Sequence, residues 1–222
     1  MAAPSSGSGK TTITLGLLRA LARAGYSVQP GKAGPDYIDP AFHSLACHTP
    51  CLNFDPWAMR PELLMAQASG DHLLIEAMMG LFDAGADGRG SPADLAVLLG
   101  LKVVMVVDCA RMSHSVGALV RGYVTHRPDI DVAGVILNKV GSPRHEAMLR
   151  DGLRGLDVPV LGIMPADPEL VLPDRHLGLV QAGEIGGIER FIEHAANRVA
   201  TGCDLDRLAA LTARRPAAAP AM

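Results

Sequence analysis

The stretch SSGSGKTT at residues 5–12 has the composition of a phosphate-binding loop. Its successive backbone N–H groups can surround phosphate oxygens, and Gly7 and Gly9 allow the anion to approach closely. Lys10 would reach the β- and γ-phosphates, and the Thr11 hydroxyl would bind Mg²⁺. Pro4 stands where the pattern G-x-x-x-x-G-K-T has its first glycine. The run G-K-T-T entering a helix still predicts nucleotide binding. The expected nucleotide ligands in this loop are Gly7, Ser8, Gly9, Lys10, Thr11 and Thr12.

Four acidic residues follow apolar runs of the chain. Glu76 comes directly after one such run, and Asp83 lies seven residues further on in a glycine-rich stretch. Asp36 and Asp39 follow a short strand expected at residues 27–30. Open α/β sheets bind ligands at the carboxyl ends of their strands. We therefore expect these carboxylates to converge near the phosphates, where phosphoryl transfer needs acids to hold a metal and to place the reactants.

Asn138 and Lys139 end another apolar run, at residues 132–137. Guanine-specific proteins continue this pattern to an aspartate that binds the base, but position 141 is glycine. Asn138 can still hydrogen-bond an adenine edge. The sequence therefore favours ATP over GTP as the nucleotide.

Short apolar runs alternate with helical patterns along the chain. The runs lie at residues 73–75, 103–107, 132–137 and 158–163. Continuous apolar strands are typical of parallel sheets that are covered on both faces. The first helix is expected at residues 12–24, and Ser91-Pro92 and Ser142-Pro143 mark two later helix starts. This alternation predicts an α/β fold: a P-loop, doubly wound, mostly parallel sheet with helices on both faces.

Two motifs carry a resemblance to a known family. With GKAGPDYIDPAFH at residues 31–43 and IEAMMGLFDAGADG at residues 75–88, the chain resembles the cobyrinic or hydrogenobyrinic acid a,c-diamide synthases of cobalamin synthesis. The likeness covers nearly the whole chain, including CARMSHSVGALVRGY, GVILNKVG and LPDRHLGLVQAGE. It implies a fold like that of dethiobiotin synthetase. It also implies an ATP-dependent ligase that amidates the a and c acetate groups of a corrinoid through an acyl phosphate.

The resemblance also implies roles for particular residues. Thr11, Asp36 and Glu76 would hold Mg²⁺, and Asp39 would help to organise the metal and the γ-phosphate. Lys32 would neutralise the transferring phosphoryl group. Tyr37, Ile38 and Asp83 would face the corrinoid carboxylates. The expected catalytic residues are Lys10, Lys32, Asp39 and Asp83.

Charge and composition limit the partners. The net charge of −3 argues against nucleic acid, and no apolar run approaches the ~20 residues that span a bilayer. We expect a cytoplasmic protein, with a homodimer left open. A polycarboxylate ring needs positive charge around it, and Arg89 and Arg111 are the candidates for binding it.

The ends of the chain depart from the family pattern. We expect an ATP-dependent amidoligase domain at residues 1–200 and a linker at residues 201–222 towards a glutaminase domain that these residues do not include. Ammonia would come from glutamine through that domain. The strand that should precede the phosphate loop is represented at most by Ala2 and Ala3, so its first part is expected to be missing.

Two other functions stay open at this point. One is a partitioning or positioning ATPase, which would act as a switch, but its signature lysine five positions before the loop lysine is replaced by Ser5. The other is amidation of a different tetrapyrrole, such as nickel sirohydrochlorin.

Overall fold

The computed structural model describes residues 1–170 and 187–214. Six parallel strands form two groups of three. One has the order β2-β1-β3 and the other the order β4-β5-β6. The strands are β1 (Val28–Ala33), β2 (Leu52–Phe54), β3 (His72–Glu76), β4 (Val103–Asp108), β5 (Val132–Val140) and β6 (Val160–Pro165). The parallel α/β fold is as predicted, while β2 was not foreseen from its short sequence.

Residues 1–3 join the two groups of strands. Ala2 pairs in parallel with Met105 of β4, and its N–H donates to the Val104 carbonyl at 2.9 Å. On the other side, the Met1 ammonium donates to the Ile75 carbonyl of β3 at 2.7 Å. These residues thus lie between β3 and β4 and form hydrogen bonds with both strands, in the central position expected for Ala2 and Ala3.

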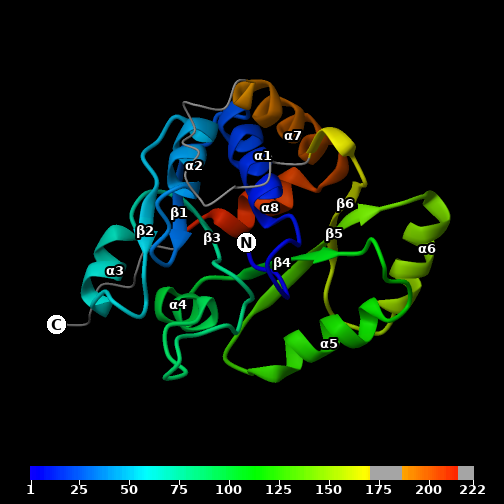
Figure 1. The fold of residues 1–222 in the computed structure, drawn as a ribbon, viewed down its shortest axis with the longest axis horizontal. Coiled ribbons are helices and arrows are strands. Elements are labelled where there is room, and N and C mark those ends of the chain that lie inside the picture. Colours follow the sequence, from blue (N-terminus) through cyan, green and yellow to red (C-terminus); the bar gives the residue numbers. More distant parts are fainter. Residues whose placement is uncertain (171–186, 215–222) are drawn as a thin grey trace.

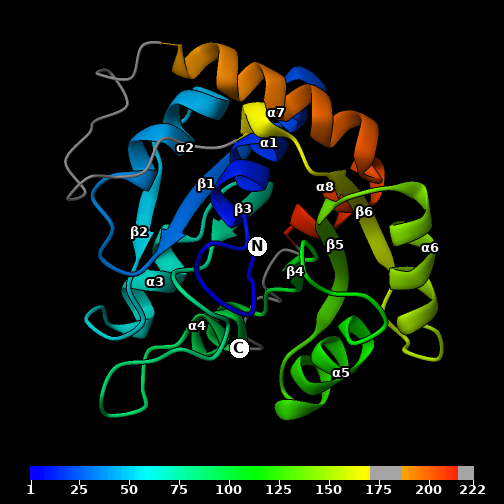
Figure 2. The ribbon, with the colours of Figure 1, turned by 45° about the vertical axis from the view of Figure 1, so that its right-hand side comes forward.

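Helices cover both faces of the strands (Figures 1 and 2). One layer contains α1 (Lys10–Arg23), α2 (Asp39–Cys47), α7 (Ile188–Gly202) and α8 (Leu205–Thr212). The other contains α3 (Pro61–Gln67), α4 (Pro92–Leu99), α5 (Val116–His126) and α6 (Pro143–Gly152), and a short 3₁₀ helix spans Pro168–Leu170. None of the helices in the described part of the chain is long and apolar enough to cross a membrane.

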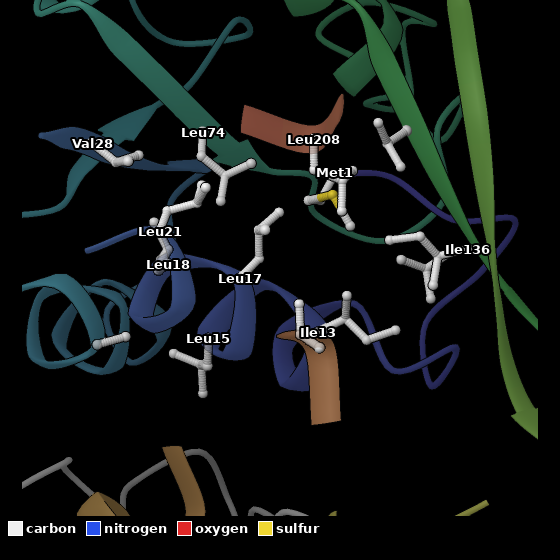
Figure 3. Close-up of a cluster of buried hydrophobic side chains, with 14 of the residues drawn as sticks. Met1, Ile13, Leu15, Leu17, Leu18, Leu21, Val28, Leu74, Ile136 and Leu208 are labelled. Carbon is white, nitrogen blue, oxygen red and sulfur yellow. The ribbon is translucent and has the colours of Figure 1, made fainter. Parts of the chain in front are cut away.

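The apolar face of α1 forms the centre of one core. Ile13, Leu17 and Leu21 are buried there, in the same cluster as Met1 and Leu208 (Figure 3). Because this helix is held by core packing on several sides, the phosphate loop before it has a rigid base.

The predicted helix starts are confirmed. Ser91 accepts a hydrogen bond from the Asp94 N–H, while the Asp94 carboxylate accepts one from the Ser91 N–H, which completes a capping box at α4. Ser142 caps α6 by accepting from the His145 N–H.

The C-terminal boundary differs from the prediction of a linker from residue 201. Residues 205–212 form α8, and Leu208 and Ala209 are buried against the core. An amphipathic helix with a buried apolar face stays packed, so the globular domain extends at least to this helix. Residues 215–222 lie outside the described part of the chain.

A cavity of about 630 Å³ lies between β3 and β4, next to Met1. Its lining includes Leu73 and Ile75 from one strand and Val104 from the other. Burial lowers the pKa of the Met1 ammonium to about 6. The two groups of strands are therefore bridged by Met1, which bonds to β3, and Ala2, which pairs with β4, and they are separated by this cavity further along.

Candidate functional site

The phosphate loop enters α1 through left-handed glycines. Gly7 has φ 79° and Gly9 has φ 90°, a region that residues with a side chain rarely adopt. A Cβ atom on Gly9 would also clash with the amide nitrogen of Asn138. Asn138 donates to the Ser8 carbonyl at 2.9 Å, so in this structure its amide supports the loop. Its predicted contact with an adenine base stays a prediction.

Within the loop, side chains bind backbone carbonyls. Lys10 is buried, and its ammonium donates to the carbonyls of Met79 at 2.7 Å and Ser5 at 3.3 Å. Burial lowers the pKa of Lys10. Ser8 donates to the Ser5 carbonyl at 2.9 Å, and Thr12 is half-buried in the first turn of α1. The lysine ammonium is thus held at the loop, where a phosphate oxygen could accept from it.

Three charged side chains meet below the loop. The ammonium of Lys32, on β1, lies 2.7 Å from the Asp39 carboxylate and 3.0 Å from that of Glu76. Lys32 is 4% exposed and Glu76 1%. The Asp36 carboxylate lies further from the ammonium, at 3.8 Å. Such a cluster is costly to bury unless its charges are paired, and this one is paired on both sides of the lysine.

The pKa values of this cluster follow from burial and pairing. Burial alone would raise the pKa of Glu76, but the hydrogen bond from His43 and the charge of Lys32 outweigh it, so this pKa lies well below its ordinary value. Burial and the nearby Glu76 charge raise the pKa of Asp39. Burial acts to lower the pKa of Lys32, but the negative charges of Glu76 and Asp39 outweigh this effect, so the pKa is raised. Lys32 is therefore a fixed cation at neutral pH.

Glu76 also contacts the phosphate loop. The Thr11 hydroxyl donates to its Oε1 at 2.7 Å. Mg²⁺ prefers oxygen ligands of this kind, a hydroxyl beside a carboxylate. Two of the three predicted metal ligands therefore meet. The third, Asp36, accepts hydrogen bonds from the N–H groups of Ile38 and Asp39 at the start of α2. Burial acts to raise the pKa of Asp36, but these hydrogen bonds outweigh it, so this pKa is lowered.

The contact between His43 and Glu76 was not predicted from the sequence. His43 is fully buried on α2, and its Nε2 lies 2.7 Å from Oε2 of Glu76. Its position four residues after Asp39 places both on one face of the helix, which is the signal that could have revealed it. The two oxygens of Glu76 are thus bound by different partners.

Lys139 and Asp108 form a second unpredicted contact with the loop. The Lys139 ammonium lies 2.6 Å from the Asp108 carboxylate and donates to the Gly7 carbonyl at 3.3 Å. Asp108 is the last residue of β4, and Lys139 is the residue before the last of β5, so both lie at the carboxyl ends of strands, as Glu76 does.

The predicted substrate residues lie at the surface. Asp83 is exposed and accepts from the Gly80 N–H at 2.7 Å, Tyr37 is 92% exposed, and Ile38 is half-buried. The Arg89 guanidinium pairs with Asp87 at 2.8 Å, and Arg111 is exposed in the turn after β4. Neither arginine contacts the Lys32 cluster within the residues that the structure describes. The motif LPDRHLGLVQAGE, at residues 172–184, lies wholly outside them.

A cavity of about 420 Å³ adjoins this site. Its lining includes Gly34 after β1, Met79 and Asp83 after β3, and Trp57 after β2. The phosphate loop, the buried lysine and carboxylate cluster, and this cavity all lie at the carboxyl ends of parallel strands. Together they define a P-loop protein of the nucleotide-binding α/β class.

Comparison with known proteins identifies the family within this class. Residues 1–180 match the family described as the CobQ/CobB/MinD/ParA nucleotide binding domain, and the chain belongs to this family. Chloroplast FtsY from Physcomitrella patens has a related fold, with a TM-score of 0.52 and 18% identity over 84% of this chain and 62% of that one.

Closer relatives by sequence confirm the expected resemblance. A hydrogenobyrinate a,c-diamide synthase of Rhizobium meliloti is 66% identical over 95% of this chain and 50% of the relative. Proteins with the same name from Brucella anthropi and Rhodobacter capsulatus are 60% and 50% identical, over 96% and 98% of this chain. The chain spans about half the length of these curated relatives.

Proposed function

We propose that this chain is the ATP-dependent amidation domain of a hydrogenobyrinate or cobyrinate a,c-diamide synthase, in cobalamin biosynthesis. The observation that carries the proposal is the placement of Lys32, buried between Asp39 and Glu76, with Glu76 bound to Thr11 of the phosphate loop. A fixed cation beside a metal-binding pair suits transfer of a phosphoryl group to an anionic acceptor. The names of the relatives supply the substrate.

The described residues fit ATP and Mg²⁺. The loop has the two left-handed glycines that a phosphate cradle needs, and Lys10 has its ammonium at the loop carbonyls. Thr11 and Glu76 offer hard oxygen ligands 2.7 Å apart. Mg²⁺ would neutralise charge on the phosphates when bound. Asp36, beside this pair, is proposed as a further ligand, and Asn138 as a contact of the adenine base.

Activation of a carboxylate is chemically necessary before ammonia can displace oxygen. In the proposed reaction, a substrate carboxylate oxygen attacks the γ-phosphorus of ATP and the bond to the ADP oxygen breaks. Ammonia then attacks the acyl carbon of the acyl phosphate. Inorganic phosphate leaves with the electron pair of the broken carbon–oxygen bond and takes up the proton that ammonia loses, which gives the amide.

Each residue has a proposed part in this sequence. Lys10 and Lys32 stabilise charge on the transferring phosphoryl group, and Asp39 holds Lys32 in place. Asp83, beside the cavity, positions the acceptor together with the substrate residues. The proposed substrate contacts are Tyr37, Ile38, Arg89 and Arg111.

The amido donor of the full-length relatives is proposed to be glutamine, hydrolysed in the half that this chain does not span. The 222 residues alone are then expected to use free ammonium. Glutamine-dependent amide formation by these residues alone would contradict this assignment.

The decisive experiment follows the oxygen of the activated carboxylate. The chain is incubated with MgATP, ammonium chloride and hydrogenobyrinate labelled with ¹⁸O in its carboxylates. The expected result is one ¹⁸O atom in inorganic phosphate for each amide formed. Phosphate without ¹⁸O, released at the same rate with or without the tetrapyrrole, would favour the ATPase switch. Parallel reactions with cobyrinate and nickel sirohydrochlorin identify the tetrapyrrole.

A further inference from the structure

The cavity of about 420 Å³ reaches the phosphate site through Met79. The Met79 carbonyl accepts from the Lys10 ammonium at 2.7 Å, and the same residue lines the cavity. Asp83 lies on the lining as well. A molecule in the cavity would therefore have one end beside the lysine that the phosphate loop positions.

Trp57, the single tryptophan of the chain, forms a fixed wall of this cavity. Its N–H donates to the Asp55 carboxylate at 2.9 Å, and its indole Nε1 donates to Asp87 at 3.3 Å. A Cβ atom on Gly90 would lie 2.6 Å from the Trp57 Cβ, and one on Gly85 would lie 3.2 Å from the ring. The two glycines thus let the loop after β3 pack closely against the tryptophan.

This indole is nevertheless 62% exposed. Large aromatic rings contribute most when their faces are covered, and a fixed ring that leaves most of its surface open is well suited to contact a flat ligand. Met79, 52% exposed, offers a second apolar surface on the same lining.

The charged side chains of the lining are acidic. They are Asp55, Asp83 and Asp87, and within the described lining no lysine or arginine is present. Asp87 is paired with the Arg89 guanidinium at 2.8 Å, so among the described residues Asp55 and Asp83 supply the unpaired negative charge of the lining. A polycarboxylate ligand would be repelled if its carboxylates entered, whereas an apolar part would replace water favourably. The cavity therefore selects the uncharged part of such a ligand.

We propose that this cavity binds the apolar edge of the tetrapyrrole ring against Trp57 and Met79, so that the carboxylate next to that edge is presented to Lys10. This inference rests on the proposed function and adds a specificity-determining residue, Trp57, to it. The remaining carboxylates of the ring stay outside the acidic lining. Which acetate reacts is then set by which edge of the ring fits the cavity.

Kinetics of Trp57→Leu and Trp57→Phe test this proposal. Trp57→Leu is expected to raise KM for hydrogenobyrinate roughly 10- to 100-fold and to leave KM for ATP within about two-fold, as for a lost apolar contact. Trp57→Phe keeps an aromatic face and should recover most of the loss. Leu63→Ala, at an exposed apolar position of α3 outside the cavity, should match the wild type.

The single indole N–H gives a readout that does not need turnover. In a ¹H–¹⁵N spectrum of the wild-type chain, hydrogenobyrinate without ATP should shift this signal in a saturable way, and MgATP alone should leave it in place. If amide formation continues but the indole signal does not move and the KM of Trp57→Leu for hydrogenobyrinate is unchanged, the proposal is overturned. If no tetrapyrrole is amidated, the proposed function fails, and the indole titration still decides whether the cavity binds the ring.

Discussion

At the scale of single residues, Lys32 has the most constrained environment of the proposed site. It is buried against two carboxylates, and Glu76 in turn contacts Thr11 and His43. Removing one partner from a buried group of charges costs about 3–5 kcal/mol, because the others lose their compensation. Stability and catalysis are therefore expected to depend on the same contacts.

Lys32→Met tests this dependence. Loss of the cation should lower kcat for amide formation by about 100- to 1000-fold, as when one preorganised donor is lost, and KM for ATP should change little. The free energy of unfolding, measured with urea, should fall by about 3–5 kcal/mol. Lys102→Met, at the exposed Lys102–Asp131 pair, should cost at most about 1 kcal/mol and leave kcat unchanged. A Lys32→Met variant with wild-type kcat would remove Lys32 from the mechanism.

His43→Ala is expected to weaken the response to Mg²⁺. Partners that orient a metal ligand typically contribute 10- to 100-fold to metal affinity, so the Mg²⁺ concentration for half-maximal activity should rise by about ten-fold or more. His43→Gln can still donate to Glu76 and should recover part of this loss. His194→Ala, at a histidine that pairs with Asp167, serves as the control. Equal Mg²⁺ curves for all three variants would show that His43 has only a packing role.

The lowered pKa of Glu76 predicts a pH dependence of stability. In the unfolded chain this carboxyl takes up a proton as the pH falls through about 4.5, whereas in the folded chain it stays ionised to lower pH. The unfolded state then binds more protons, so the stability that Glu76 contributes is complete above this range and is lost as the pH falls. Asp39 acts in the opposite sense, because its pKa is raised and its contribution is lost as the pH rises.

Urea unfolding of the wild type and Glu76→Gln between about pH 6 and pH 3.5 measures this effect. The wild type should lose more of its free energy of unfolding towards the acid end than Glu76→Gln does. Parallel curves for the two proteins would mean that Glu76 has the same pKa in the folded and unfolded states, which would contradict the lowered pKa.

At the scale of elements, helix starts fix the loops that carry the site. The capping box of Ser91 and Asp94 ends the glycine-rich segment that contains Asp83, and Ser91 is buried. Ser142 begins α6 by the same kind of contact, but its side chain is exposed. Similar sequences at two helix starts therefore have different environments.

Ser91→Ala should lower the free energy of unfolding by about 1–2 kcal/mol, since the Asp94 N–H loses the buried hydroxyl that caps the helix. Ser142→Ala should cost less, about 0.5–1 kcal/mol, because water can replace the exposed hydroxyl. Urea unfolding of the two variants gives the comparison. A larger loss for Ser142→Ala would contradict the argument from burial.

At the scale of the whole molecule, the two groups of strands are linked only in part. Residues 1–3 pair with both β3 and β4, and the cavity of about 630 Å³ separates the same strands further along. The phosphate loop begins directly after residues 1–3. How rigidly these residues are held between β3 and β4 should therefore influence nucleotide binding.

An N-terminal extension of five β-branched residues should fill this cavity and raise the melting temperature and the affinity for ATP together. Each buried side chain contributes about 1.5–3 kcal/mol, and the buried ammonium of Met1 becomes an amide. An extension of five Gly and Ser residues is the control. Equal melting temperatures for the two extended proteins would show that the cavity does not accept a strand.

Local patterns were enough to predict much of this fold. The apolar runs at β3, β4 and β5, the glycines of the phosphate loop and the serine–proline helix starts all express preferences of a few neighbouring residues. By contrast, β2 is only three residues long, and α8 lies where the sequence predicts a linker. Both are stabilised by packing against distant elements, which a local pattern does not contain.

The sequence alone determined that this chain has a phosphate loop and that Glu76, Asp36 and Asp39 follow strands at one edge of a parallel sheet. Only the tertiary structure decided which side chains meet there. Lys32 and His43 contact Glu76 from 44 and 33 residues away. Trp57 likewise reaches the loop of Asp87 from 30 residues away. The physical reason is that burial and pairing of charges depend on the packing of whole elements, whereas strands, helix starts and glycine turns depend on local geometry.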